Sequence, residues 1–597
     1  MKNTYDTLII GSGCAGFNAA DRLYNFGVRD IAIITEGINM GTSRNTGSDK
    51  QTYYKLSLCG RERDSVREMA ETLFSGGGVN GDIALTEAAY SVRAFMHLVE
   101  LGVPFPTNEY GEYAGYKTDH DPRTRATSCG PLTSKYMTEA LERSVREKNI
   151  DILDGLRVIK ILTGSGRVSG LAALDREGKL SVVGCRNIIL ATGGPAGIYY
   201  NTVYPESQSG ATGLAIDAGA LCVNLEEWQY GIASTDFRWN LSGTYQQVLP
   251  RYISVGEDGE EREFLYEKFG EKSLDMIFLK GYQWPFDTKK VNGSSQVDLA
   301  VTAEIKAGKR VFLDYTANPK GLENGFSVLS REAYTYLENS GALFGTPIER
   351  LRKMNIGAIK LYLSHGIDLS REKLAIAVCV QHCNGGVDID ADWQSRIEGL
   401  FVAGEAAGTF GVCRPGGSAL NSTQVGSLRA AEKIAREKKK MSINIPEFSL
   451  PRFGSGNADA RELLVSLRKK MSDCADFDRD TGKMRELFSE VCNLCDNFYD
   501  TVKVASDYDL LDAFMLYDTI LTQRAVLSAM LISAEKVGSH GSAFVDRKAP
   551  YENDAPRDTQ TVTDKNESYL RPVRPLPNPE LWFETLLARQ TESLKEQ

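Results

Sequence analysis

A glycine-rich turn near the N-terminus is the segment whose residue types and spacing say most about chemistry. It reads Gly11-Ser12-Gly13-Cys14-Ala15-Gly16 and follows an apolar run at residues 8–10. A second apolar run, residues 31–34, leads to Glu36, about 20 residues past the last glycine. In such a strand, turn and helix the glycines let the backbone approach a pyrophosphate, and the acid binds ribose hydroxyls. The spacing therefore predicts a dinucleotide with free ribose hydroxyls, FAD or NAD rather than NADP.

Other segments end a predicted strand, or begin a helix, at small residues. The apolar run 187–190 stops at Ala191-Thr192-Gly193-Gly194, and the run 400–403 stops at Gly404-Glu405. Gly416-Gly417-Ser418 opens a long helical pattern. Small residues at strand ends let the backbone approach a ligand, and free N–H groups at a helix start favour negative charge. We expect the strand end at residues 191–194 to bring the backbone close to a ligand.

The elements that must position these segments indicate several domains, since 597 residues exceed one hydrophobic core. The predicted fold class is α/β, with a Rossmann-like domain, an inserted α+β capping domain and a C-terminal helical domain. The expected boundaries are 1–225 and 374–440 for the nucleotide domain, 226–373 for the capping domain, 441–545 for the helical domain and 546–597 for an extended tail. Within the insertion, residues 310–315 are the clearest predicted strand. At residues 375–380 the sequence again has the pattern expected of the nucleotide domain.

Composition excludes several classes of protein. The net charge of −10 argues against a nucleic-acid groove, and the basic run Lys438-Lys439-Lys440 is interpreted as a solvated helix end. The 11 scattered cysteines are typical of reduced thiols, and none has the companions of a metal or iron–sulfur site. Without a leader or an apolar run of membrane length, we expect a cytoplasmic protein with no membrane span.

Several of these segments together resemble the flavoprotein family of fumarate reductase, succinate dehydrogenase and L-aspartate oxidase. Besides the N-terminal turn, the resemblance rests on the loop at residues 41–47, residues 191–194, residues 225–230 and the segment 399–408. The most specific block is Cys413-Arg414-Pro415-Gly416-Gly417-Ser418-Ala419-Leu420. These pieces occur in the family's order over residues 5–435.

The resemblance implies a soluble FAD-dependent oxidoreductase. Glu405 would accept hydrogen bonds from the ribityl chain, and the helix start at Ser418 and Leu420 would stabilise negative charge on the flavin. Respiratory members carry a histidine bonded to FAD in the loop after the second strand. Asn45 stands at that place here and cannot form the bond, so FAD should be held non-covalently. The cofactor-binding residues implied are Gly11, Gly13, Cys14, Ala15, Gly16, Glu36, Gly37, Thr42, Ser43, Asn45, Thr46, Gly47, Ser48, Val158, Ala191, Thr192, Gly193, Gly404, Glu405, Gly417, Ser418, Ala419 and Leu420.

At the substrate, the family pattern is kept in part. Arg414 resembles the arginine that binds the substrate carboxylate, and His382 lies near the position of a histidine that helps to bind it. Gly231 replaces the histidine of the family's Gln-x-His-Pro-Thr stretch. The acid arginine of a Pro-Arg-Asp-x-x-x-Arg stretch is expected near Ser294, where no arginine stands.

An active enzyme therefore needs another proton donor, and an altered pocket. The candidates for the donor are Tyr230, Tyr245, Arg251, His120, Arg123 and Arg125. The expected activity is hydride transfer between flavin N5 and a carbon next to a carboxylate-bearing group, as in an enoate reductase whose substrate is not fumarate. The alternatives are an aspartate-oxidase-like amino acid oxidase, or the flavoprotein subunit of an electron-transfer complex with an iron–sulfur partner, like adenylylsulfate reductase. No second dinucleotide unit is evident, so the electrons would come from a partner protein or a small carrier, and an oligomer is possible.

Overall fold

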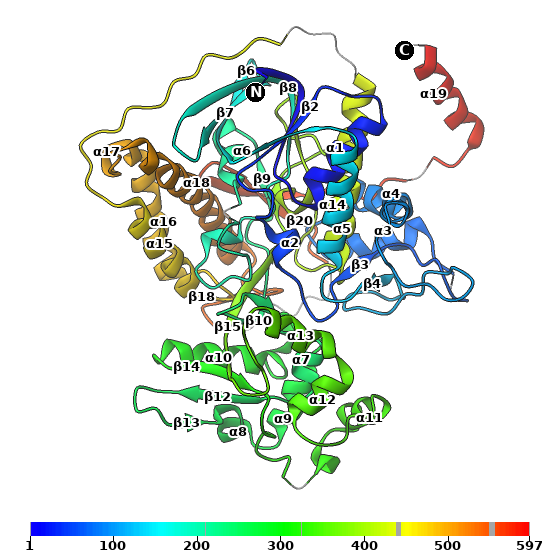
Figure 1. The fold of residues 1–597 in the computed structure, drawn as a ribbon, viewed down its shortest axis with the longest axis vertical. Helices are drawn as coiled ribbons and strands as arrows, with labels where there is room; N and C mark the ends of the chain where they lie inside the picture. Colours follow the sequence, from blue (N-terminus) through cyan, green and yellow to red (C-terminus); the bar gives the residue numbers. More distant parts are fainter. Residues whose placement is uncertain are drawn as a thin grey trace.

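The computed structural model describes residues 2–61, 63–208, 210–323, 325–437, 443–548, 556–578 and 580–595. The basic run at Lys438-Lys439-Lys440 lies outside the described residues. A mixed sheet, a helix-rich insertion and a helical bundle meet around one cavity (Figure 1). No helix in the described ranges combines the length and the apolar character needed to cross a bilayer.

The first sheet is the core of the nucleotide domain. Its strand order is β5-β2-β1-β8-β7-β6, with β17 paired to β8. β5, β2, β1, β8 and β17 run parallel. Strands β2 and β17 and the carboxyl ends of β1 and β8 are buried on both faces, which explains their continuous apolar runs. The elements are β1 Thr4–Ile10, α1 Cys14–Asn25, β2 Ile31–Thr35, α2 Thr42–Asn45, β3 Thr52–Tyr54, α3 Val66–Phe74, α4 Gly81–Glu100, β4 Ala126–Ser128, α5 Thr133–Glu147, β5 Asp151–Asp154, β6 Leu156–Gly164, β7 Arg167–Asp175, β8 Leu180–Leu190, α6 Thr212–Ala218 and β9 Cys222–Val223, and after the insertion β16 Gly386–Val387, β17 Leu400–Val402 and α14 Ser418–Glu437.

Helices cover one face of this sheet. α1 packs against α14 and α5, and α14 packs against α4, so the four helices stand together beside the sheet (Figure 1). The carboxyl ends of β1, β2, β8 and β17 meet at one edge, which is where parallel α/β sheets bind ligands. Every predicted strand end with small residues therefore points to the same place.

The insertion forms the lower part of the molecule in Figure 1 and has its own antiparallel sheet, ordered β11-β10-β15-β14-β12-β13. Residues 310–315 do form a strand, β14. Residues 375–380, however, do not return to the nucleotide sheet, because β15 pairs with β10 and β14. The elements are β10 Trp228–Ser234, β11 Trp239–Asn240, α7 Thr244–Gln247, β12 Arg251–Val255, β13 Glu261–Arg262, α8 Phe264–Phe269, α9 Lys272–Leu279, α10 Ser295–Lys306, β14 Arg310–Asp314, α11 Arg331–Asn339, α12 Pro347–Met354, α13 Ile356–Ser364 and β15 Leu374–Cys383.

The C-terminal part is a helical bundle followed by a tail. α18 packs against α15 and α16 and also against α6 of the nucleotide domain. The predicted extended tail contains a hairpin of two strands, β20 and β21. This hairpin pairs with β9 of the nucleotide domain. The elements are α15 Ala460–Cys474, β18 Asp478–Arg479, α16 Thr481–Asp496, α17 Phe498–Thr501, α18 Asp507–Lys536, β19 Phe544–Val545, β20 Thr559–Asp564, β21 Glu567–Pro572 and α19 Phe583–Lys595.

Candidate functional site

A continuous cavity of about 2210 Å³ lies at the carboxyl edge of the first sheet, between the nucleotide domain, the insertion and the C-terminal bundle. Twenty of the predicted cofactor residues line it. They are Gly11, Gly13, Cys14, Ala15, Glu36, Gly37, Thr42, Ser43, Thr46, Gly47, Ser48, Val158, Ala191, Thr192, Gly193, Gly404, Glu405, Gly417, Ala419 and Leu420. Residues from six separated segments therefore surround one space.

The glycine turn forms a cradle that no larger residue could form. Gly11 has φ +109°, and a Cβ there would overlap the carbonyl oxygen of Ala191. A Cβ at Gly16 would overlap the carbonyl oxygen of Gly11, so Gly16 serves close packing and does not line the cavity. Gly13 precedes α1 in extended conformation, and the Cys14 N–H donates to Ser43 Oγ at 3.3 Å. The start of α1 thus opens onto the cavity, as a pyrophosphate requires.

Polar atoms that line the cavity also fit a bound ligand. Buried polar groups in proteins nearly always have a hydrogen-bond partner. Several cavity-lining atoms have none among the described residues, and a ligand can supply it. They are Thr42 Oγ1, Arg157 Nε, Thr192 Oγ1, Asn240 Oδ1, Gln381 Oε1, His382 Nε2 and Arg414 Nε.

The end of the cavity at Glu36 contains residues that the sequence did not reveal. Glu36 forms an ion pair with Arg157, and both line the cavity. Across from them, α18 contributes Tyr517 and Asp518. Burial raises the pKa of Asp518 to about 7. α18 is an apolar helix far along the chain, and no motif marks it as part of a nucleotide site.

Two predicted cofactor residues are turned away from the cavity. The Asn45 side chain is exposed and donates to the carbonyl oxygens of Asn39 and Gly41, both at 2.9 Å. Ser418 is fully buried, and its hydroxyl donates to the Pro415 carbonyl at 2.8 Å, whereas Ala419 and Leu420 of the same helix start line the cavity. In both cases the side chain donates to a backbone carbonyl only a few residues away along the chain, and it does not point into the cavity.

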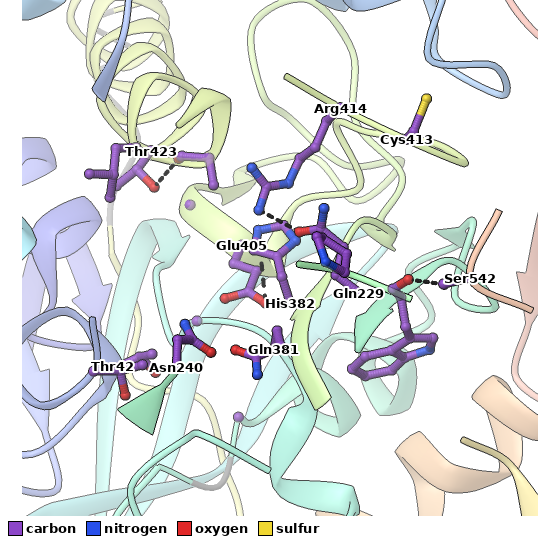
Figure 2. Close-up of a pocket in the computed structure, with 18 of the residues that line it drawn as sticks. Thr42, Gln229, Asn240, Gln381, His382, Glu405, Cys413, Arg414, Thr423 and Ser542 are labelled. Atoms are coloured by element: carbon purple, nitrogen blue, oxygen red, sulfur yellow. Dashed lines mark hydrogen bonds and ion pairs between the residues drawn. The ribbon is translucent and has the colours of Figure 1, made fainter. Parts of the chain in front are cut away.

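Arg414 reaches from the loop before α14 into the cavity, as Figure 2 shows. Its Nη2 donates to Gln229 Oε1 at 2.7 Å, and its guanidinium lies 5.5 Å from the centroid of the Phe410 ring. Burial lowers the pKa of Arg414 to about 10, partly offset by the Glu405 carboxyl. A buried guanidinium with a neutral amide as partner favours an anion in the cavity.

His382 belongs to β15, where it is paired with Gln229 of β10. Its side chain lies beside that of Arg414 (Figure 2). Its pKa is held well below the usual value by burial and by the Arg414 charge, so the ring is neutral. The Asn384 amide donates to the Gly411 carbonyl at 2.7 Å, and its Oδ1 lies 3.1 Å from His382 Nδ1. Since Oδ1 only accepts, Nδ1 carries the proton, and Nε2 is left as an acceptor without a hydrogen-bond partner among the described residues.

Glu405 lies next to His382 and lines the cavity. Its Oε1 accepts from the Tyr204 hydroxyl and from the Cys383 N–H at 2.9 Å, and lies 3.9 Å from His382 Nε2. Burial raises the pKa of Glu405 to about 7. A carboxyl that is partly protonated near neutral pH can both donate and accept toward a ligand.

The region of the missing family residues is closed by aromatic side chains. A Cβ at Gly231 would lie 2.6 Å from Trp284 Cε2, so the Trp284 ring fills the space beside this glycine. Ser294 does not line the cavity, and its hydroxyl donates to Gln283 Oε1 at 2.7 Å. The cavity is lined instead by the earlier segment Pro285-Phe286-Asp287.

Of the candidate proton donors, His120 alone lines the cavity within the described ranges. Arg123 pairs with Glu68, Arg125 with Asp64 and Asp121, and Arg251 with Glu263 and Asp314. Tyr230 and Tyr245 are buried away from the cavity. Lys290, which was not a candidate, also lines it, 3.7 Å from Asp119 and 3.8 Å from Asp287.

The fold and this cavity define a flavoprotein in which a glycine cradle for a dinucleotide meets an anion-binding arginine. Comparison with known proteins agrees. The family described as FAD binding domain matches residues 6–420. One subunit of the fumarate reductase (CoM/CoB) of Methanothermobacter marburgensis is 27% identical over 555 residues, which cover 90% of this chain and 93% of that protein. L-aspartate oxidase of Agrobacterium fabrum is 27% identical over 435 residues, 72% and 73% of the two chains.

Solved structures share the whole architecture. Sdh1 of Mycobacterium smegmatis superposes with a TM-score of 0.74 at 17% identity, over 98% of this chain and 97% of that one. Adenylylsulfate reductase of Archaeoglobus fulgidus gives a TM-score of 0.64 at 16% identity, over 97% of each chain. The chain therefore belongs to the FAD-dependent oxidoreductases of the fumarate reductase and succinate dehydrogenase family, and FAD is its cofactor.

Proposed function

We propose that this chain is an enoate reductase that holds FAD without a covalent bond and acts on an α,β-unsaturated carboxylate other than fumarate. The observation that carries the proposal is the buried Arg414 guanidinium, whose Nε has no partner among the described residues. An anion on the substrate satisfies that charge, because an arginine fork binds a carboxylate through two parallel hydrogen bonds. The substrate then lies beside His382 and Gln229.

In this proposal FAD, when bound, is the two-electron carrier that supplies or accepts the hydride. The Arg414 charge stabilises the carboxylate and the negative charge that grows on it as the β-carbon gains a hydride. The α-carbon must then gain a proton, so that R–CH=CH–COO⁻ becomes R–CH₂–CH₂–COO⁻ with two electrons and two protons. Of the donors considered from the sequence, we retain His120, because it lines the cavity.

A covalent FAD bond is not expected. Asn45 is turned away, and the loop residue that faces the cradle is Ser43, which forms no such histidyl bond. Acid denaturation should therefore release all flavin into the supernatant. Flavin that remained with the precipitated polypeptide would contradict this part of the proposal.

The direct test is an anaerobic titration of the holoenzyme after chemical reduction, followed by flavin absorbance. Unsaturated mono- and dicarboxylates are added one at a time. Reoxidation by an enoate, with fumarate a poor acceptor, supports the proposal, and a clear preference for fumarate contradicts it.

The same preparation separates the two alternatives. Bleaching of the oxidised flavin by L-aspartate would favour an amino acid oxidase, the activity that the name of one relative states. Another relative is named as one subunit of a fumarate reductase, which motivates a search for a partner protein. An iron-rich subunit that co-purifies, together with no turnover by this chain with a simple electron donor, would favour an electron-transfer complex.

A further inference from the structure

The Trp284 ring forms a wall of the cavity and packs against Gly231 of β10. A Cβ at Gly231 would lie 2.6 Å from Trp284 Cε2 and 2.8 Å from Cζ2, so the ring and the glycine backbone are in direct contact. The indole N–H donates to the Ile232 carbonyl at 3.3 Å. Because this bond uses its one donor, the ring presents carbon atoms to a ligand in the cavity that it lines.

A buried ion pair fixes the backbone at Trp284. Lys280 and Asp298 have fully buried side chains and lie 2.7 Å apart. The Lys280 ammonium also donates to the Trp284 carbonyl at 2.7 Å and to the Gln283 carbonyl at 3.2 Å. All three N–H donors of the ammonium are thus used. Two of them bond the backbone at residues 283 and 284, so the fold itself fixes the position of Trp284.

Apolar side chains line part of the cavity that Trp284 lines, together with polar ones such as Gln381, which donates to the Gly231 carbonyl at 3.3 Å. Trp228, Pro285 and Phe286 line the same cavity. The Lys290 charge is offset by Asp119 and Asp287, on the side of the cavity near Cys413. A carboxylate against the indole would lose water without gaining a partner there, which is unfavourable, whereas an aromatic ring would gain an aromatic contact.

We propose that the substrate is an α,β-unsaturated monocarboxylate with a large apolar β-substituent, best an aryl group, that packs on Trp284 while Arg414 binds the carboxylate. This inference rests on the proposed enoate reductase function and names its substrate class. Trp284 is then the residue that sets specificity, by contact with the β-substituent.

The test compares wild-type holoenzyme with Trp284→Ala and the conservative Trp284→Phe. Phe344→Ala, at an exposed position of the insertion, is the control for a change outside the cavity. We expect wild type to prefer cinnamate to crotonate and to fumarate in kcat/KM. Trp284→Ala should lose about 10- to 100-fold with cinnamate and change crotonate by less than about threefold, while Trp284→Phe keeps most of the preference.

A binding assay on the oxidised holoenzyme keeps the inference independent of turnover. Wild type should bind 3-phenylpropionate more tightly than succinate, and Trp284→Ala should lose that difference. Equal losses with cinnamate and crotonate, or tighter binding of succinate, would overturn the inference while the enoate reductase function stands. If no enoate reoxidises the reduced flavin, the proposed function fails, and the binding comparison alone decides whether Trp284 selects an apolar group.

A double variant should improve the binding of a dicarboxylate. Gly231→His combined with Trp284→Ala removes the ring and restores a basic side chain at the wall. It should bind succinate more tightly than Trp284→Ala does, whereas Gly231→His alone, which the ring blocks, should not. Identical succinate binding in the double variant and in Trp284→Ala counts against the wall as the basis of selection.

Discussion

The two ends of the cavity are built in different ways. At the cradle, Gly11 and Gly16 act by having no side chain, and the backbone of β1, β8 and α1 forms the surface. At the substrate end, Arg414, His382 and Trp284 act through their side chains. Arg414 comes from the loop before α14, and the other two come from the insertion. A backbone surface tolerates little change, whereas side chains from an insertion can be exchanged to alter the substrate. The following predictions separate the two ends.

The largest effect is expected from Gly11→Ala, which places a methyl group against the Ala191 carbonyl at φ +109°. FAD affinity should fall by at least about 100-fold, or ~2.7 kcal/mol, and all activity with it. The measurement is the flavin-to-protein ratio and the Kd for added FAD. Gly27→Ala is the matched control, because Gly27 also has a positive φ, +91°, but nothing lies near its Cβ. Equal losses in both variants would show that strain alone, and not the cradle, is responsible.

Arg414→Ala should act at the other end alone. FAD content should stay as in wild type, while kcat/KM with an enoate falls by about 100- to 1000-fold, because a buried charge-assisted pair is lost. Arg414→Lys should recover little, since a point charge cannot replace the fork. Arg371→Ala, at an exposed position, is the control. Unchanged turnover in Arg414→Ala would remove the arginine from the proposed mechanism.

His382 predicts a pH dependence of binding. Its Nε2 carries no proton, so the ring must take up a proton to donate to a carboxylate through this atom. The pKa of the free enzyme lies well below 6.5, and therefore the Kd of a saturated carboxylate should rise with pH, by up to about tenfold per unit from pH 6 to 8. Isothermal calorimetry in two buffers of different ionisation enthalpy measures the proton uptake.

Glu405 titrates in the same range, with a pKa of about 7, and lies near His382. The pH dependence should persist in Glu405→Gln and disappear in His382→Gln. A Kd that is flat with pH in wild type would mean that His382 stays neutral in the complex and does not bind the carboxylate.

The last prediction concerns stability at Glu87, which is not among the residues that line the cavity. Glu87 on α4 is buried, which raises its pKa from 4.5 to about 8. The folded protein thus keeps a proton that the unfolded chain releases, so this group destabilises the fold increasingly as pH rises from 4.5 to 8. Glu87→Gln stays neutral and should gain unfolding free energy over wild type by ~1 kcal/mol per pH unit in that window. Urea midpoints measure the difference, with exposed Glu257→Gln as control, and parallel pH curves for Glu87→Gln and wild type would contradict it.

The cradle could be predicted from sequence because its signal is local. Gly11, Gly13 and Glu36 are read from spacing along one strand–helix–strand unit, and the structure places all three at the cavity. Asn45 and Ser418 could not be placed in the same way, since a side chain within reach of a local carbonyl turns to it. A match to a family motif predicts where a residue lies along a loop, but it does not predict where the side chain of that residue points.

The substrate end depends on contacts between distant segments. Phe286 rather than Ser294 lines the cavity, which follows from the packing of the insertion and not from any motif. Tyr517 and Asp518 come from a helix that no pattern links to a nucleotide. The loss of the histidine at Gly231 was visible in the sequence, but the ring that replaces it, Trp284, is 53 residues further on, at position 284 against 231, and only the fold brings the two together.

The central claim is that one cavity holds FAD on a glycine cradle and an enoate between Arg414 and Trp284. The most direct test is a crystal structure of the oxidised holoenzyme with 3-phenylpropionate. We predict the pyrophosphate at Gly11 and Gly13, the carboxylate on Arg414 and the phenyl ring on Trp284. A carboxylate bound at Lys290, with Arg414 still on Gln229, would contradict the account.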